Sequence, residues 1–324
     1  MFWLLVTVLL IISGIGFIKK ENWWSWLAIV SALVSFVLII TVWKDAKFGI
    51  IANFIILIAA FISIMTLSFN RKTESEIALI MEQSEGLEKT TVSEIEIREL
   101  PEPVQKWLRV SGVVGKEKIQ SVWLKQKVRM KMKPEQKSWN EAVAEQYFTI
   151  RNPAFIWKVK MKMFSFISVA GRDKFEKGKG EMMIKMFSLF NLVNEKGEKM
   201  DEGTMQRFLG EIVWFPTAVL SPYTKWGPIN NYSAKATMNY HGTSASGIFT
   251  FNENGDFVKF STLRYLGNDL DSKRYNWVIN AIERTEFDGI AIPTKLDVNW
   301  SLDDGIWKWL EIEILDIKYN LGIK

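Results

Sequence analysis

The chain has 324 residues, a net charge of +5, one histidine (His241) and no cysteine. The lack of cysteine excludes disulfides, thiolate nucleophiles and thiolate metal sites, and a single histidine excludes a zinc site built from several histidines. The small net charge gives no indication of a nucleic-acid partner, and we expect neither a cofactor nor a bound metal.

The first seventy residues are almost free of charge. Three uncharged runs, at 1–18, 23–43 and 48–69, are each long enough as a helix to cross a hydrocarbon core about 30 Å thick. We therefore predict a multi-pass anchor of three transmembrane helices in residues 1–70, with Asn53 hydrogen-bonded to a neighbouring helix. A cleaved signal peptide over the first run is the alternative, but no basic residues precede that run.

The next segment, residues 71–99, is charged and is expected to form a juxtamembrane helix or linker. Apolar residues at helical spacing favour the helix (Ile77, Ile80 and Met81). Residues 100–112 predict a second, short helix, because Pro103 suits a first turn and Gly112 suits a C-terminal stop.

Residues 100–324 predict one β-rich soluble domain. In 122–132, 141–151 and 155–163, apolar side chains alternate with polar ones, which is the period of a strand with one buried face. Further strands are predicted at 181–187, 234–240, 246–251, 257–265, 274–287, 291–301 and 306–319. The short turns between them favour antiparallel pairing.

One amphipathic helix interrupts the predicted strands. Its apolar residues recur at helical spacing, Asp201 and Glu202 suit its first turn, and Pro216 limits its end (Met205, Phe208, Leu209, Ile212 and Val213). The predicted fold is thus three N-terminal transmembrane helices followed by an α+β domain, in which a long curved antiparallel sheet wraps around a helix.

Several short motifs follow one another along the soluble domain. They are LPEPVQKWL at 100–108, EQYF at 145–148, GRD at 171–173 and WFPTAVL at 214–220. Together they resemble an uncharacterised family of bacterial membrane-anchored proteins, a domain of unknown function, and this resemblance implies no activity. The order of strands and helix is also similar to the half-barrel of Lol-type lipoprotein carriers, which holds acyl chains; a likeness of architecture does not establish function.

Two indications conflict on which side of the membrane the soluble domain lies. Basic residues flanking the predicted spans place the soluble domain in the cytoplasm by a margin of two. The carrier-like architecture favours the outside instead. We expect a multi-pass protein of the cell membrane with an extracytoplasmic soluble domain.

The predicted ligand-binding residues form the apolar lining between sheet and helix. Methionine and aromatic side chains suit an adaptable hydrophobic pocket. The alternative is that the same residues form an ordinary, filled core. A sequence does not distinguish a filled core from a pocket. The candidates are Phe148, Trp157, Met161, Met163, Met182, Met186, Phe208 and Trp214.

Four polar residues in or near the motifs are the other candidates: Glu145, Arg172, Asp173 and Glu211. Paired carboxylates could serve acid–base chemistry, and structural ion pairs explain them equally. We assign none of them as catalytic. Cationic strand faces at 125–131 and 158–162 suggest docking on anionic lipid, with a solvated, partly neutralised face as the alternative.

Three functions remain in competition. The leading hypothesis is a membrane-tethered module that binds a hydrophobic or lipid-like ligand, with membrane lipids or a lipoprotein as partners. The second is an enzyme acting on a membrane-associated substrate, which needs Glu145, Asp173 or Glu211 to converge in a cleft. The third is a structural envelope protein without a small ligand, which an exposed apolar patch would favour.

Overall fold

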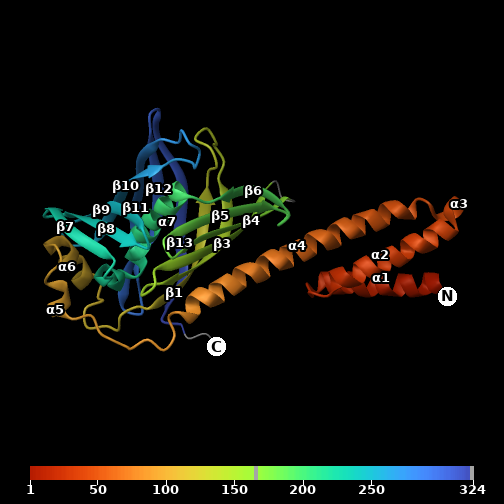
Figure 1. Cartoon of the computed structure of the whole chain (residues 1–324), viewed down its shortest axis with the longest axis horizontal. Coiled ribbons are helices and arrows are strands. Elements are labelled where there is room, and N and C mark those ends of the chain that lie inside the picture. The colour runs from red at the N-terminus through yellow and green to blue at the C-terminus, as the bar shows by residue number, and fades with distance from the viewer. Residues whose placement is uncertain (164–166, 322–324) are drawn as a thin grey trace. The chain divides into compact units, whose positions relative to one another are not determined.

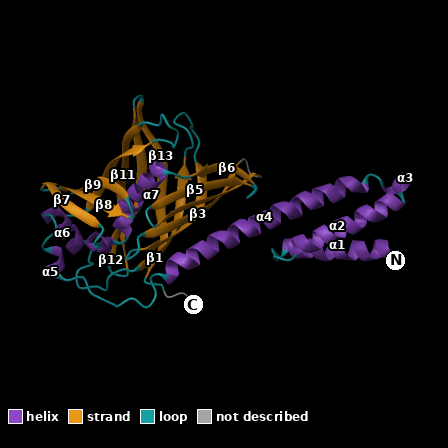
Figure 2. Ribbon diagram, in the orientation of Figure 1, coloured by secondary structure: helices purple, strands orange, loops and turns teal. Residues whose placement is uncertain are grey.

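A computed structural model describes residues 1–163 and 167–321, except the side chain of Met163. The chain divides into two compact units, which we describe separately (Figure 1). The first comprises Met1–Glu74 together with Met186–Phe190, and the second comprises Ser75–Lys185 and Asn191–Lys324. The first is mainly helical, and the second contains most of the strands together with several helices (Figure 2).

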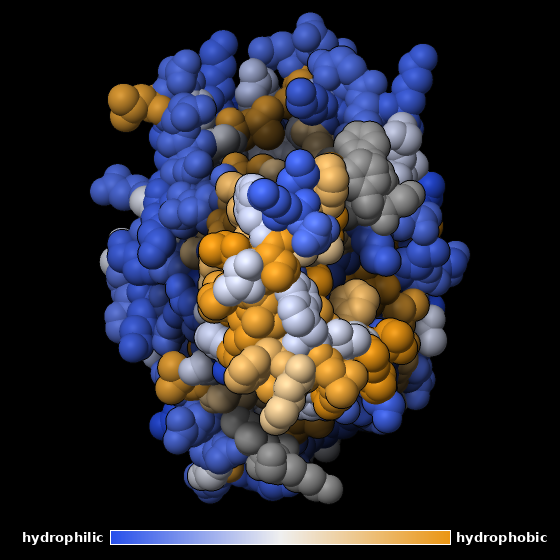
Figure 3. Space-filling view, turned by 90° about the vertical axis from the view of Figure 1, so that its right-hand side faces the viewer, coloured by the Kyte–Doolittle hydropathy of each residue, from blue (hydrophilic) through white to orange (hydrophobic). Residues whose placement is uncertain are grey.

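The first unit contains α1 (Phe2–Ile18), α2 (Trp24–Thr41), α3 (Trp43–Ala46) and the start of α4 (Gly49–Glu82). α1 and α2 pack together, and the small side chains of α2 are buried. The expected partner of Asn53 is Ser35 of α2, whose Oγ accepts a hydrogen bond of 3.0 Å from Asn53 Nδ2. Many large apolar side chains of these helices are exposed. Figure 3 shows apolar surface on the side of the molecule that faces the viewer.

The three predicted membrane segments are all helical, but they differ in length. α2 and α4 are long and apolar enough to cross a membrane, whereas α1 has only 17 residues. The prediction of three spans is therefore supported for two helices. α4 also continues to Glu82 as one helix, because 70–82 contains neither glycine nor proline to stop it.

Two short helices lead into the sheet. α5 (Glu94–Ile97) begins with a capping box, in which Ser93 and Glu96 each bond the backbone N–H of the other. α6 (Glu102–Val110) matches the predicted helix and ends before Gly112, whose φ of 76° favours glycine.

Thirteen strands of the described ranges form one curved sheet, with the order β6-β5-β4-β3-β2-β1-β13-β12-β11-β10-β9-β8-β7 (Figure 1). Their pairing is antiparallel, and β1 pairs with β13 through the register Val128↔Ile312. The strands are β1 (Ser121–Met130), β2 (Asn140–Thr149), β3 (Ala154–Met163), β4 (Ile167–Glu176), β5 (Lys179–Met186), β6 (Phe190–Glu195), β7 (Thr224–Asn230), β8 (Ser233–Tyr240), β9 (Thr243–Phe251), β10 (Phe257–Tyr265), β11 (Arg274–Phe287), β12 (Ile290–Leu302) and β13 (Gly305–Tyr319). The predicted antiparallel sheet is confirmed, and β4, β6 and β7 are additions to it.

The interrupting helix α7 (Glu198–Glu211) packs on β4, β8, β9 and β10, and the 3-10 turns η1 (Ile212–Trp214) and η2 (Pro216–Leu220) follow it. The five residues predicted for its apolar face are all buried, but Ile212 and Val213 lie in η1 because α7 ends at Glu211. The helix begins at Glu198, and Asp201 lies in its first turn as predicted. Asp201 also accepts a 2.8 Å hydrogen bond from the backbone N–H of Gly180 in β5.

We call the face of the sheet that packs against α7 the inner face. On β1 the even-numbered residues are buried while the lysines and the arginine alternate with them, as the sequence pattern predicted. The opposite, outer face of β3 is covered by the end of α4, where Ile77, Ile80 and Met81 pack on Ala154 and Ile156. The sheet therefore buries apolar side chains on both faces near β3.

Candidate functional site

One end of the inner face is filled by aromatic side chains. We call this group the aromatic core: Phe148, Phe155, Phe175, Phe208, Trp214 and Phe215. Phe148 lies at its centre, with ring centroids 4.7 Å from Phe215 and 6.1 Å from Phe208. The indole N–H of Trp214 donates to the carbonyl of Pro293 at 3.1 Å. Rings at these separations fill the space between sheet and helix.

The predicted apolar lining is distributed over several environments. Phe148, Phe208 and Trp214 belong to the aromatic core, whereas Trp157 and Met161 are buried further along β3. Met182 is half-buried on β5, and Met186 belongs to the first unit. The side chain of Met163 lies outside the described part of the chain. Ligand binding by these residues stays a prediction.

A row of polar side chains crosses the inner face beside the aromatic core. Gln146, Trp157 and Asp173 lie directly opposite one another on β2, β3 and β4. The indole N–H of Trp157 donates to Gln126 Oε1 at 2.9 Å, and Gln146 Nε2 donates to Glu211 Oε2 at 2.8 Å. These groups are buried, so their mutual hydrogen bonds offset the cost of removing them from water.

Arg207 of α7 joins the two carboxylates of this row. Its Nη1 donates to Asp173 at 2.7 Å, and its Nε donates to Glu211 at 2.8 Å. Burial raises the pKa of both carboxyl groups, and the neighbouring Arg207 charge opposes that rise. The positive charge of Arg264 on β10 acts on both carboxyl groups from a longer distance and also opposes the rise.

The four polar candidates do not form one site. Asp173 and Glu211 converge on Arg207, but Glu145 and Arg172 lie on the outer face, because neighbouring strand residues point to opposite sides. Arg172 is 1% exposed and donates to Glu76 and Glu181, each at 2.9 Å. Glu145 pairs with Lys158 at 3.0 Å. The outer polar residues thus form structural ion pairs.

The cationic strands are partly neutralised on the outer face. Lys127 lies 3.8 Å from Glu141, and Arg129 lies 2.7 Å from Glu311 across β1 and β13. This arrangement favours the alternative of a solvated, charge-paired surface. Within the described ranges, no group of three or more acidic or histidine side chains is placed to hold a metal ion.

The sequence alone did not predict four polar residues of the inner face as site residues: Gln126, Gln146, Arg207 and Arg264. The available signal was a polar residue at a position where the strand period demands an apolar one, as at Gln126 and Gln146. The packing of α7 on β4 brings Arg207 to Asp173. No feature of the sequence predicted that packing.

At the end opposite the aromatic core, which we call the open end, the inner face is less completely buried on β13, while Trp277 and Trp300 of the neighbouring strands are buried. Ile314 and Ile312 of β13 are buried, whereas Leu310, Trp309 and Trp307 are half-buried. Trp307 pairs with Trp300 of β12, and Trp300 pairs with Trp277 of β11, so three tryptophans form a row across three strands. We call these three the tryptophan row.

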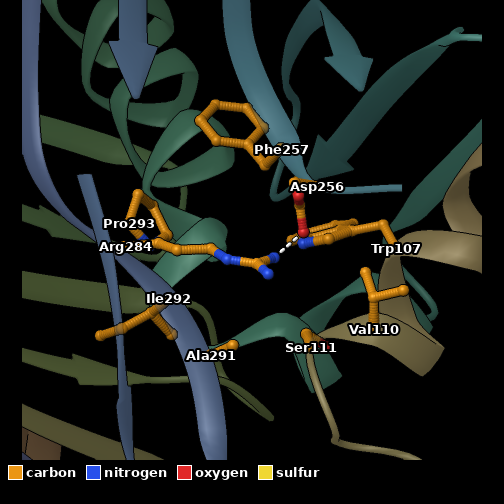
Figure 4. A pocket seen from close by; sticks show the side chains of 9 residues that line it. All are labelled: Trp107, Val110, Ser111, Asp256, Phe257, Arg284, Ala291, Ile292 and Pro293. Atoms are coloured by element: carbon orange, nitrogen blue, oxygen red, sulfur yellow. Dashed lines mark ion pairs between the residues drawn. The ribbon is translucent and has the colours of Figure 1, made fainter. Parts of the chain in front are cut away.

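A separate hollow lies between α6 and the ends of β10 to β12 (Figure 4). It has a volume of about 20 Å³, which is enough for about one water molecule. Arg284 and Asp256 form an ion pair beside Trp107 there, and Figure 4 shows their charged groups pointing toward each other. This hollow is too small for a lipid-like ligand.

A comparison with curated proteins finds no match. Among solved structures, a LolA superfamily protein from Nitrosomonas europaea is similar at 11% sequence identity and a TM-score of 0.37. That similarity covers 68% of this chain and 94% of the other.

The motifs identified above fall in a segment that matches a known family. The match is to the family of unknown function DUF6544 and extends over residues 90–312. It includes α5, α6, α7 and most of the sheet, and therefore both the polar row and the tryptophan row. Since this segment is more than half of the sequence, the chain belongs to DUF6544.

Proposed function

We propose that this protein is a membrane-tethered module that binds a hydrophobic, lipid-like ligand at the open end of the inner face. The observation that carries the proposal is the change in burial along β13. Its inner-face residues are buried beside the aromatic core, but Trp307, Trp309 and Leu310 are only half-buried and keep part of their apolar surface accessible. Apolar side chains left in contact with water at one end of a sheet provide a surface that a hydrocarbon ligand can cover.

The tether in this proposal is the helical first unit, with α1, α2 and α4 as its spanning helices. A membrane anchor accounts for the exposed apolar side chains of these helices, which are costly to leave in water. We expect the full chain to stay in the membrane pellet after an alkaline carbonate wash. Release into the supernatant would contradict the tether.

The proposed side of the membrane is the outside. A C-terminal alkaline phosphatase fusion should be active, and a matching C-terminal fluorescent-protein fusion that folds only in the cytoplasm should be dark. The reverse pattern would place the soluble domain in the cytoplasm, without affecting ligand binding.

Ligand binding is tested on the full chain, purified in mild detergent and analysed by native mass spectrometry. We expect a copurified lipid-like molecule. Leu310→Glu should reduce its occupancy, because a carboxylate placed on the half-exposed apolar surface disfavours hydrocarbon. Ile306→Glu is the matched control, since Ile306 lies on the same strand but is 79% exposed.

Two results would contradict the proposal. One is a chain that carries no lipid and takes up none from added vesicles. The other is an equal loss of ligand in Leu310→Glu and Ile306→Glu, because this would show a general effect of added charge and not a defined surface.

A further inference from the structure

The open end contains hydrogen-bond donors without acceptors. The indole N–H groups of Trp277, Trp307 and Trp309 are buried, and no hydrogen-bond partner for them exists in the described part of the protein. Trp277 as a whole is only 3% exposed. A buried donor without a partner is uncommon in folded proteins and costs roughly 1–3 kcal/mol. Three such donors in one region therefore call for an explanation.

The donors are close together in the sheet. Trp277 and Trp307 are the two end members of the tryptophan row and lie two strands apart, on β11 and β13. Adjacent strands lie about 4.8 Å apart, so the two backbones are separated by about 10 Å. Trp309 follows Trp307 where the register between β12 and β13 shifts. The two indoles therefore lie on the same face of the sheet, on either side of Trp300.

A cation lies over the same row. The guanidinium carbon of Arg264 is 4.7 Å from the ring centroid of Trp277 and 6.0 Å from that of Trp300. Among the described residues, no carboxylate forms an ion pair with Arg264, although Asp173 and Glu211 act on it from a longer distance. By contrast, Arg207, Arg172 and Arg274 each have carboxylate partners.

The helix makes room for this guanidinium. A Cβ atom at Gly203 of α7 would lie 3.1 Å from Arg264 Nε, so glycine permits the close approach. Burial and the charge of Arg207 lower the pKa of Arg264 to about 10. A positive charge held here against its own desolvation is stabilised when an anion binds beside it.

From this geometry we propose that the open end holds the anionic head of an amphiphile, with carboxylate or phosphate oxygens between Arg264 and the indole N–H groups of Trp277 and Trp307. The hydrocarbon part would cover the half-exposed surface at Leu310 and Trp309. This inference rests on the proposed function and specifies the class of its ligand. Indole and guanidinium groups donate hydrogen bonds and accept none, so the complementary group is an acceptor.

The test uses the full chain in nanodiscs and two photoreactive probes of equal length. One is a diazirine-bearing fatty acid and the other is its fatty-alcohol analogue, and crosslinked peptides are identified by mass spectrometry. We expect the acid to label β11 to β13 more strongly than the alcohol does. Arg264→Gln should reduce acid labelling by about tenfold, as loss of a charge-assisted hydrogen bond implies, and should leave alcohol labelling unchanged.

Arg274→Gln is the matched control. Arg274 lies on the neighbouring strand and pairs bidentately with Glu202, outside the tryptophan row. Its loss should not change acid labelling. Trp277→Phe keeps an aromatic ring but removes the N–H group, and it should weaken acid labelling less than Arg264→Gln. Gly203→Ala should weaken acid labelling through displacement of Arg264.

The outcomes separate this inference from the proposed function. Equal labelling by acid and alcohol in the wild type, or acid labelling unchanged in Arg264→Gln, would overturn the anionic head group while leaving a hydrophobic ligand in place. Labelling of the open end by neither probe would contradict the proposed function itself. Displacement of the acid by inorganic phosphate at low concentration would identify a site for free phosphate and overturn the amphiphile.

Discussion

The two ends of the inner face use tryptophan in opposite ways. Trp214, in the aromatic core, is 1% exposed, donates its N–H to Pro293 and accepts a 2.8 Å hydrogen bond from Tyr319 at its carbonyl. Trp277, in the tryptophan row, is almost equally buried, yet its N–H has no partner in the described residues. The N–H of Trp214 is satisfied within the protein, whereas the unsatisfied N–H of Trp277 calls for an explanation.

The largest expected effect lies in the aromatic core. Phe208→Ala should lower the free energy of unfolding by about 3–5 kcal/mol, because it opens a cavity among rings that contact one another on all sides. Leu310→Ala at the open end should cost less than about 2 kcal/mol, since its side chain is already half-exposed. Chemical denaturation of the full chain in detergent measures both. Equal costs would remove the distinction between the two ends.

The next effect tests the polar row that separates the two ends. Arg207→Met leaves Asp173 and Glu211 buried without their shared partner, which should cost about 3–5 kcal/mol near neutral pH. Because burial raises the pKa of both carboxyl groups, the folded state takes up protons more readily than the unfolded state. The deficit should therefore shrink as the pH falls through these raised pKa values.

Melting temperatures of wild type and Arg207→Met between pH 8 and pH 5 provide the measurement. The gap between the two proteins should narrow toward the acid end. A gap independent of pH would mean that Arg207 stabilises the fold through packing on Phe155 and Trp157 and not through its charge.

Much of this architecture follows from side-chain periodicity. The alternation on β1 to β3 and the helical spacing on α7 predicted both elements and their buried faces, because burial on one face leaves a direct trace in the sequence. The missed strands lack that trace. β7 contains Gly227 and Pro228 and lies at an edge of the sheet, and β4 carries Arg172 and Asp173 in its centre.

The candidate site was harder to predict because it depends on contacts between distant segments. Arg207 reaches Asp173 across 34 positions, and the tryptophan row requires the register of β11, β12 and β13. No local pattern encodes such pairings. Glu145 and Asp173 belong to two motifs, and only the register of β2, β3 and β4 places them on opposite faces, because Glu145 is opposite Lys158 and Asp173 is opposite Trp157.

A smaller effect concerns the outer-face ion pairs of Arg172 with Glu76 and Glu181. Burial opposes ionisation of Glu181, but hydrogen bonds from Lys196 and Arg172 lower its pKa to about 2. A lowered folded-state pKa contributes stability that is present above the ordinary glutamate value and is lost as the pH falls toward about 2. Glu181→Gln should cost roughly 1–2 kcal/mol at neutral pH and should show a weaker acid transition than the wild type. If the acid transition is unchanged in Glu181→Gln, other carboxylates are responsible for the loss of stability at acid pH.

The smallest effect is the most direct comparison of the two ends. Trp214→Phe and Trp277→Phe remove the same atoms from two almost fully buried side chains, so the losses of packing are similar. Only Trp214 also loses a hydrogen bond and leaves the carbonyl of Pro293 without its donor. We therefore expect Trp214→Phe to be less stable than Trp277→Phe by about 1 kcal/mol in the ligand-free protein. If Trp277→Phe is the less stable of the two, the N–H of Trp277 has a structural partner. That result would contradict the proposed anion site at the open end.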